Sequence, residues 1–590
     1  MIASHGEEVL SCCESMLKYG DDAVSLICIE LATTIECART RMVVLQMIAR
    51  MLAAVMMLGV AIAQADSSAE RLLKQDIDRQ EQERRERRWD EPMTTMPQQQ
   101  PAPSSPEKAE AKGPCFPISD IRVIKADILP AKPLQRLIAS YTGRCLYITD
   151  LQSLQQAMNS LALSRGLITT RVVIPEQNLG NGMLLLEVWP GHMEESRLNS
   201  AHRMELDMAL PLQNGDLLNL RALEQAIDNL NRLESMQATM QLEPGEKPGG
   251  SIADFTIIRQ RPWHLAATWD SEAMEQHPSN TMRLSLTLDS PLNLADRLIV
   301  GLNANLQDVE VDNANGSSID YELPIGWWRF STGMDQYEYH NPITAGLTTF
   351  ISSGKSQSTR IELSRLIWRD DKHRMIVALN GKQRTNNNFI DDVTIAVSSS
   401  RLKTAGLRID ISRVQAPWVI DGGFGVEQGD ARSLASPSPV DEEFMRLMAS
   451  TRLQYHWPHS SLAWIVNAQW SDSVLLPSEQ FALAGSVRGF YPLSLNVATG
   501  LASRVEWARP VFFDWRGLTN VRPQIGIEFS HAPSVSGNES EERLTALTAG
   551  MIVPWKKLLA QLMVAAPLAS TSTQSPPDDW QLDASVSLKW

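Results

Sequence analysis

The chain has 590 residues, of which 43% are apolar and 21% are charged. This length exceeds one ordinary domain, and this apolar content excludes a disordered polymer, so we expect several folded domains. The formal net charge of −15 argues against a nucleic-acid binder, because neutralising phosphates requires an excess of Lys and Arg. We therefore expect proteins or lipids as partners, and no nucleic acid.

The apolar run MLAAVMMLGVAIAQA occupies residues 51–65 and ends in the small-x-small trio AQA. This pattern predicts a signal peptide over residues 47–65, cleaved before Asp66. A membrane helix is the alternative, but the run is shorter than the roughly 20 residues that span a bilayer. Residues 1–46 then stand upstream of the signal, and we expect them to be an extension before the true start codon. Candidate starts are Met42, Met47 and Met51.

All six cysteines lie in the first quarter of the chain, at Cys12, Cys13, Cys28, Cys37, Cys115 and Cys145. A long cysteine-free region suits export to an oxidising compartment, where a stray thiol would be a hazard. We expect a disulfide between Cys115 and Cys145, which bracket a predicted strand and short helix. Such a bond would stabilise the fold by limiting the unfolded chain. Two buried free thiols are the alternative.

Residues 66–92 are dense in helix formers and in alternating charges, and they predict a polar helix. Only Leu72, Leu73 and Ile77 give this helix an apolar side, so a solvated or frayed segment is the alternative. Residues 93–114 are rich in Pro, Gln and Ser, which favours an extended linker. The two segments together predict a mobile helix on a long tether.

Residues 115–262 contain a weak internal repeat of helix followed by strands. Apolar residues recur at helical spacing in both copies, at Leu151, Leu154, Met158 and Leu161, and at Leu220, Leu223, Ile227 and Leu230. Gly166 ends the first helix, and the stretches ITTRVVIP and MLLLEV follow it as strands. In the second copy MQATMQL and ADFTII are the strands. We predict two small α+β domains, over residues 115–191 and 192–262.

Residues 263–590 change to short stretches in which apolar and polar residues alternate, as expected for strands with two unlike faces. A soluble sandwich would alternate too, but this region is larger, and 14 of the 16 tryptophans lie in it. Many stand near predicted strand ends, as in the aromatic belts at both interfaces of a membrane barrel: Trp263, Trp269, Trp368, Trp418, Trp507 and Trp590. Closing a sheet satisfies its backbone in lipid. At about 20 residues per strand plus turn, we predict a transmembrane antiparallel β-barrel of about 16 strands.

Five stretches in order resemble the outer-membrane transporters of two-partner secretion, over residues 47–590. They are CFPISDIRV with GRCLYITDLQSL, then GLITTRVVIPEQNLGNGMLLLEV, TLDSPLNLADRL and LLPSEQFALAGSVRGFY. The resemblance implies a plug helix, a linker, two polypeptide-transport-associated (POTRA) domains in the periplasm, and a 16-stranded barrel in the bacterial outer membrane. It also implies a pore that recognises and secretes a large partner exoprotein, which is a haemolysin, an adhesin or a contact-dependent toxin.

The tetrapeptide Val487, Arg488, Gly489 and Phe490 looks like the family's VRGY motif. In the family this motif lies on an extracellular loop that folds back into the barrel, where its arginine pairs with an acidic wall residue. A guanidinium is always charged and offers a rigid fork of donors, so in a narrow lumen it seeks a carboxylate. Glu528 in the stretch GIEFS takes the acidic place, although this stretch departs from the family's Phe-x-Asp-x-Gly. A surface-loop cation held by a rim carboxylate is the alternative.

The resemblance further implies that an exoprotein with an N-terminal secretion domain adds along an exposed strand edge of the POTRA domains, and that the transporter is a monomer in outer-membrane lipid. We expect no enzymatic activity, cofactor or metal. The stretch SSGKS, Ser352–Ser356, has Thr349 where a phosphate loop needs glycine. An insertase of the barrel-assembly family is the main alternative function, and a passive pore or uptake receptor is another.

Overall fold

The computed structural model describes residues 68–95, 114–272, 279–305, 313–345, 348–435, 442–490, 495–533, 541–571 and 580–590. The predicted signal peptide and residues 1–46 lie outside the described residues, as does most of the predicted linker. The predicted polar helix is present as α3, Ser68–Trp89. Arg87 and Arg88 in its last turn complement the negative end of the helix dipole. None of the described helices is long and apolar enough to cross a membrane.

The first predicted α+β domain contains two small sheets and two main helices. Its elements are β1 (Phe116–Ile118), β2 (Asp120–Ile124), α4 (Ala131–Tyr141), β3 (Arg144–Leu146), α5 (Ile148–Ser164), β4 (Arg171–Val173) and β5 (Met183–Trp189). The main sheet has the order β2-β5-β4, and β1 pairs with β3. The predicted apolar stripe of α5 supplies buried Leu154 and Met158, which pack with Leu184 and Leu186 of β5. Gly166 has a φ of +80°, so it ends α5 in a conformation that side chains disfavour.

A disulfide joins Cys115 and Cys145, whose Cα atoms lie 5.4 Å apart. It ties β3 to the start of β1, where Pro117 pairs with Cys145. From the sequence, one strand and one short helix were predicted between the two cysteines. The structure has two strands, β1 and β2, before α4, because Ser119 separates two short extended runs that read as one.

The second domain repeats the helix and strand order of the first. Its elements are β6 (His192–Leu198), α6 (Arg203–Ala209), α7 (Leu220–Asn231), β7 (Met236–Pro244) and β8 (Gly250–Arg259), with the sheet order β6-β8-β7. The predicted stripe of α7 packs Leu223 and Leu230 against Phe255 of β8 in a buried core. The strand β6 was not predicted, since its sequence HMEESRL is mostly polar.

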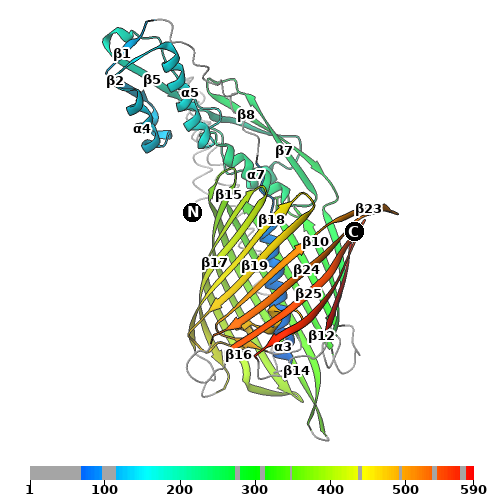
Figure 1. Ribbon diagram of the computed structural model, residues 1–590. Helices are drawn as coiled ribbons and strands as arrows, with labels where there is room; N and C mark the ends of the chain where they lie inside the picture. The colour runs from blue at the N-terminus through cyan, green and yellow to red at the C-terminus, as the bar shows by residue number, and fades with distance from the viewer. Residues whose placement is uncertain are drawn as a thin grey trace, which may run out of the picture. The chain divides into compact units, whose positions relative to one another are not determined.

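The remaining strands form a closed antiparallel barrel (Figure 1). They are β9 (Trp263–Glu272), β10 (Ser279–Asp289), β11 (Arg297–Asn305), β12 (Asn313–Ile325), β13 (Trp328–Ala345), β14 (Thr348–Arg369), β15 (His373–Ile390), β16 (Val393–Gln415), β17 (Trp418–Ser433), β18 (Glu443–Trp457), β19 (Ser460–Trp470), β22 (Gly500–Ala508), β23 (Val511–Trp515), β24 (Leu518–Ala532), β25 (Glu542–Trp555), β26 (Leu558–Ser570) and β27 (Gln581–Lys589). The last strand closes on the first, with Val586 opposite Trp269. Because β22 and β23 pair with successive parts of β24, the described residues form 16 strand positions, as predicted.

Several strands are longer than the predicted spacing allows. The strands β14 and β16 have 22 and 23 residues, whereas about 10 tilted residues span a membrane. The end of β14 that is farthest from the two α+β domains carries Ser352, Ser353, Ser356 and Ser358, all of which are buried. The stretch SSGKS thus lies within a strand and not in a phosphate loop.

Tryptophans gather at the rim of the barrel from which β9 begins, next to the second POTRA domain. Exposed indoles stand at about half of the strand ends there, at Trp263, Trp328, Trp368, Trp418, Trp457, Trp515, Trp555 and Trp590. Trp470 and Trp580 stand at strand ends of the opposite rim. Exposed indoles thus stand at strand ends of both rims, and among the described residues they are more numerous at the rim from which β9 begins. Such a ring marks the level where lipid headgroups meet the hydrocarbon.

Candidate functional site

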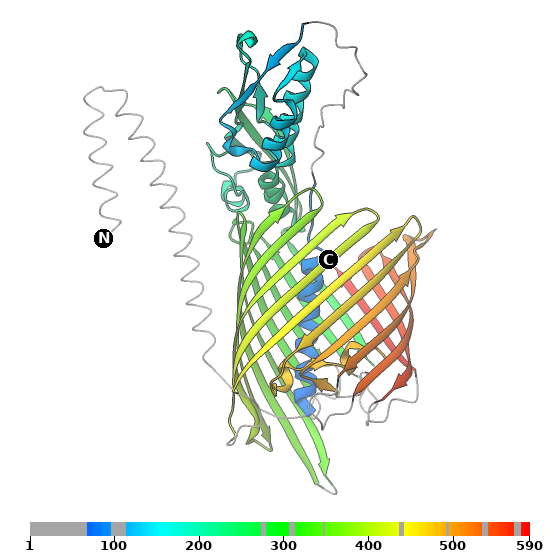
Figure 2. The ribbon, with the colours of Figure 1, turned by 60° about the vertical axis from the view of Figure 1, so that its left-hand side comes forward.

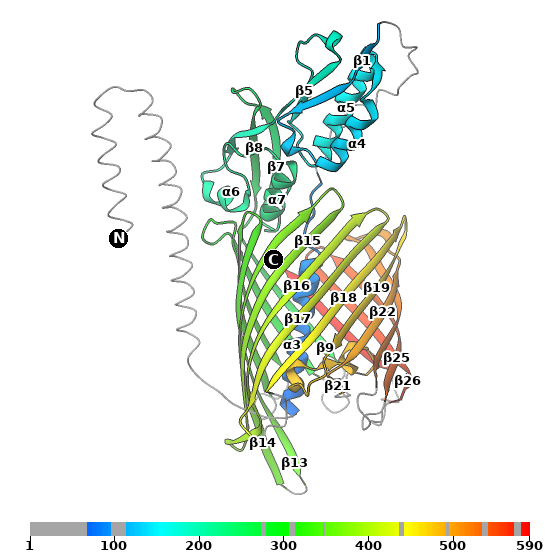
Figure 3. The same ribbon diagram turned by 90° about the vertical axis from the view of Figure 1, so that its left-hand side faces the viewer.

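The segment between β19 and β22 folds back into the barrel. It contains the short elements η4 (Pro477–Glu479), β20 (Phe481–Ala482), η5 (Ala484–Ser486) and β21 (Asn496–Val497), which Figure 3 shows within the barrel wall. Leu475 and Leu476 pack against Phe444 of β18 at one side of the lumen. Val487 and Phe490 pack against Leu544 of β25 at the other. The loop therefore crosses the lumen, held by an apolar contact at each side.

Arg488 of this loop lies against Glu528 of β24. Its backbone N–H donates to Glu528 Oε2 at 2.6 Å, and its Nε donates to Oε1 at 2.6 Å. A second carboxylate, Glu506 of β22, also pairs with the guanidinium. Glu528 has only 1% of its side chain exposed, so the ion pair is shielded from water. Arg488 is thus held by two strands that neighbour each other, and Glu506 was not anticipated from the sequence.

Gly489 and Phe490 of the motif have different structural roles. Gly489 has a φ of +92°, and a side chain there would meet Ala565 and the backbone of Pro567 on β26. Glycine therefore lets the loop turn and lie against the wall. Phe490 is fully buried, so it anchors the turn by packing.

A second cluster of ion pairs holds the N-terminal half of the loop between β19 and β22. Glu479 is fully buried and accepts hydrogen bonds from Lys382 at 2.7 Å and from Arg384 at 3.0 Å, both on β15. Arg446 of β18 contacts it at 2.8 Å and also pairs with Glu427 of β17. Glu479 lies in the family-like stretch LLPSEQFALAGSVRGFY, but its role was not predicted from the sequence. Its signal was a lone acid nine residues before Arg488 in an otherwise apolar loop.

The helix α3 lies in the lumen beside this loop (Figure 2). Ile77 packs with Ala314 of β12 and with Tyr337 and Tyr339 of β13. Arg283 of β10 pairs with Glu83 at 2.9 Å, and Arg85 pairs with Asn467 of β19. The helix is thus contacted from several sides of the wall, by apolar packing at Ile77 and by polar bonds at Glu83 and Arg85.

The C-terminal end of α3 is held by arginines of the barrel. Arg452 of β18 donates to Asp90 at 2.8 Å and lies over the ring of Trp89, 5.1 Å from its centroid. Arg329 of β13 pairs with Glu91, and Arg374 donates to the carbonyl of Pro92 at 3.3 Å. These contacts lead the chain out of the lumen toward the POTRA side.

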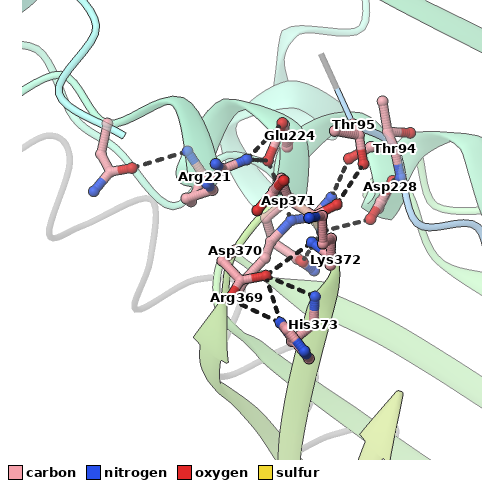
Figure 4. Close-up of polar contacts among 12 residues, drawn as sticks. Thr94, Thr95, Arg221, Glu224, Asp228, Arg369, Asp370, Asp371, Lys372 and His373 are labelled. Carbon is pink, nitrogen blue, oxygen red and sulfur yellow. Dashed lines mark hydrogen bonds and ion pairs between the residues drawn. The ribbon is translucent and has the colours of Figure 1, made fainter. Parts of the chain in front are cut away.

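The tail after α3 meets α7 and the turn between β14 and β15 (Figure 4). The N–H of Thr94 donates to Asp228 of α7 at 2.8 Å, and its carbonyl accepts from Arg369 of β14 at 2.5 Å. Arg369 also pairs with Asp228 and lies 3.4 Å from Glu224. One buried guanidinium therefore joins the tail, the second POTRA domain and the barrel.

The turn beside this network is itself ordered by hydrogen bonds. Burial alone would raise the pKa of Asp370, but the backbone N–H groups of Lys372 and His373 donate to its carboxylate and lower the pKa below its ordinary value. An ionised Asp370 therefore fixes the tight turn, so that Arg369 is presented to α7.

The stretch TLDSPLNLADRL forms the turn between β10 and β11 and docks on the second POTRA domain. Ala295 enters the buried core of that domain. Ser290 donates to the buried carboxylate of Glu205 on α6 at 2.7 Å, and Asp289 accepts from the N–H of Ser235 at 2.8 Å. This stretch carries part of the family resemblance, but its contact with the second domain was not predicted from the sequence. The second POTRA domain is thus anchored to the barrel by apolar packing as well as polar bonds.

Comparison with known proteins decides the family. The profile of the haemolysin secretion/activation proteins ShlB/FhaC/HecB matches residues 249–553. The chain belongs to this family. A ShlB-type POTRA domain matches residues 116–191, and a further POTRA domain matches residues 192–244.

Relatives with the same architecture are outer-membrane transporters. The chain is 26% identical over 496 residues to the outer membrane transporter CdiB of Dickeya dadantii, covering 80% of this chain and 87% of that one. It is 25% identical over 501 residues to the hemolysin transporter ShlB of Serratia marcescens, covering 82% and 87%. The solved structure of CdiB from Escherichia coli has the same fold, with a TM-score of 0.78, 23% identity, and 90% of this chain and all of that one covered.

The family match establishes the transporter as an outer-membrane pore of two-partner secretion, in preference to the barrel-assembly insertase. In this family the POTRA domains sit in the periplasm. The rim that carries the tryptophan ring is therefore the periplasmic rim. Its indoles mark the inner leaflet of the outer membrane.

Proposed function

We propose that this transporter rests in a closed state in which α3 plugs the lumen, and that it opens for an exoprotein whose N-terminal secretion domain binds the POTRA domains. The exported partner is a haemolysin, an adhesin or a contact-dependent toxin, and the first of these is supported by relatives named as hemolysin transporters. The observation that carries the proposal is the set of contacts from Ile77 to Thr94, which keeps α3 in the space an exported chain must use.

The lumen wall suits an unfolded polypeptide. Charged side chains from strands that are separated by one strand pair there, such as Arg360 with Asp320 at 2.6 Å and Arg408 with Glu362 at 2.6 Å. A paired polar wall offers a passing chain few apolar surfaces to adhere to, while the loop with Arg488 and Glu528 keeps the lumen in shape. We assign this support to Val487, Arg488, Gly489, Phe490 and Glu528.

The POTRA sheets offer open edges for an extended partner. The strands β2 and β4 are the edges of the first main sheet, and β6 and β7 are the edges of the second. Main-chain pairing along such an edge binds an unfolded segment with little regard to its sequence. The barrel is closed, so the wall described needs no second copy, and we propose a monomer.

Comparing the proteins in the culture medium with and without the gene for this chain tests the proposed function. We expect one very large secreted polypeptide to disappear on deletion and to return when the chain is supplied from a plasmid. A chain without residues 115–261 is the matched control, and should insert as a barrel without restoring the polypeptide. An unchanged medium, together with reduced assembly of other barrels, would instead support an insertase.

A further inference from the structure

One part of the periplasmic rim extends beyond its neighbours. The ladder between β19 and β22 ends at Ser461 opposite Ala508, but the chain continues as β23, which pairs with the start of β24. We call residues 509–522 the rim hairpin. Figure 1 shows β23 projecting past the rim, close to the C-terminus.

The rim hairpin exposes large apolar side chains. Phe512 is 71% exposed and Trp515 is 60% exposed, and Val511 and Phe513 are also exposed. A protein surface in water seldom gathers such side chains without a partner. The described residues leave these side chains uncovered, so the hairpin offers a surface to which a partner can bind.

Basic residues surround these aromatic side chains. Residues 509–522 and the neighbouring turn, residues 555–558, hold five basic residues and one acidic residue, in a chain with a net charge of −15. The basic residues are Arg509, Arg516, Arg522, Lys556 and Lys557. The two turns touch, because Trp555 Nε1 donates to the carbonyl of Arg516 at 3.3 Å and Leu518 pairs with Trp555.

Two of these cations occupy unusual backbone positions. Arg516 has a φ of +49° and Lys556 a φ of +53°, each at the first position of a tight turn. Glycine and asparagine are the ordinary residues there, since a side chain disfavours positive φ. The turns thus carry cations where the backbone alone would select a small residue.

We propose that the rim hairpin and the turn 555–558 form a surface that binds anionic phospholipid in the inner leaflet of the outer membrane. The position favours lipid over a protein partner, because the hairpin continues the tryptophan ring between Trp457 and Trp555. Indoles in that ring mark the headgroup level, and basic residues beside it attract anionic headgroups. Phe512 and Trp515 enter the interface while Arg516, Lys556 and Lys557 hold the phosphate.

Native mass spectrometry of the full chain in nanodiscs of phosphatidylethanolamine and phosphatidylglycerol tests the charge part of this proposal. The R516Q/K556Q/K557Q variant removes three exposed cations, and we expect it to retain about fivefold less phosphatidylglycerol than the unsubstituted chain. The matched control K132Q/R136Q/R165Q removes three exposed cations from the first POTRA domain and should retain the normal amount. Unchanged retention in the rim variant, or an equal loss in the control, would overturn the proposal.

A fluorophore at the exposed Thr519 tests the position of the hairpin. The T519C chain is labelled and placed in vesicles whose phospholipids carry bromine near the headgroup, and the unsubstituted chain gives the background from native cysteines. We expect quenching above background, and about threefold less of it in T519C/F512S/W515S. An absence of quenching above background would overturn the lipid proposal.

Discussion

Arg369 Nη1 on the barrel strand β14 lies 2.5 Å from Asp228 Oδ2 on helix α7 of the second POTRA domain. The Arg369 side chain is 1% exposed, and its other Nη atom donates to the carbonyl of Thr94 in the tail of α3. The position of the periplasmic domain is thus coupled to the exit of the plug through one side chain. A partner that moves α7 would also release the tail.

Arg369→Gln should loosen the plug. Removing one partner of a buried ion pair costs about 3–5 kcal/mol, because the buried carboxylate of Asp228 then loses its guanidinium, whereas Glu224 keeps its bond to Arg221. We expect more frequent channel openings in planar bilayers. Arg432→Gln is the control, since its pair with Asp430 is exposed to solvent and contributes little to stability. Equal opening frequencies for Arg369→Gln and the unsubstituted chain would disprove the coupling.

Arg488→Ala should reduce export of the partner while leaving the barrel inserted. The loop would lose its bonds to Glu528 and Glu506, but the barrel ladders do not depend on them. Arg488→Lys should secrete less partner than the unsubstituted chain and more than Arg488→Ala, since an ammonium lacks the fork of donors. Secreted partner is measured in the medium and the barrel in outer-membrane fractions. Normal secretion by Arg488→Ala would remove this loop contact from the mechanism.

Glu479→Gln should lower the thermal stability of the folded barrel. The substitution keeps the shape of the side chain but leaves Lys382, Arg384 and Arg446 with less negative charge in a buried site, at a cost of about 3 kcal/mol. The measurement is the temperature at which the barrel loses its compact form on gel electrophoresis. Glu443→Gln at an exposed position is the control. Equal midpoints for both variants would show that Glu479 does not fix the loop.

Cys115→Ser with Cys145→Ser should destabilise the first POTRA domain. The disulfide closes a loop of about 30 residues. Without it the unfolded chain has more conformational entropy, which lowers the stability of the domain by roughly 3–4 kcal/mol. Proteolysis of the full chain should then cleave within residues 115–191 faster than within residues 192–262, with dithiothreitol producing the same pattern in the unsubstituted chain. Cleavage that stays as slow as in the oxidised chain would contradict this role.

The spacing of apolar residues was sufficient to predict the helices and strands that have one apolar and one polar face. The helix stripes at Leu154 and Leu223, and the alternation that starts at Met282, each reflect one apolar face, so local sequence determines them. The polar strand β6 escaped prediction because its partner strand β8 supplies most of the apolar contact.

The contacts within the lumen were harder to predict, since they join residues far apart in sequence. The pairing of Arg488 with Glu528 was proposed from the family resemblance, whereas Glu506 and the Glu479 cluster were missed. A buried carboxylate has no periodic signal, and its partners on β15 and β18 become neighbours only when the barrel closes. The network at Arg369 was missed for the same reason.

Locking α3 to the wall tests the central claim most directly. Ile77 packs with Ala314, so a short thiol cross-linker applied to I77C/A314C should fix the helix in the lumen, with each single variant as the control. A cleavable linker allows release. The account predicts that cross-linking abolishes secretion of the partner and that cleaving the linker restores it. Secretion at the normal rate through the cross-linked transporter would contradict the claim that the plug must leave.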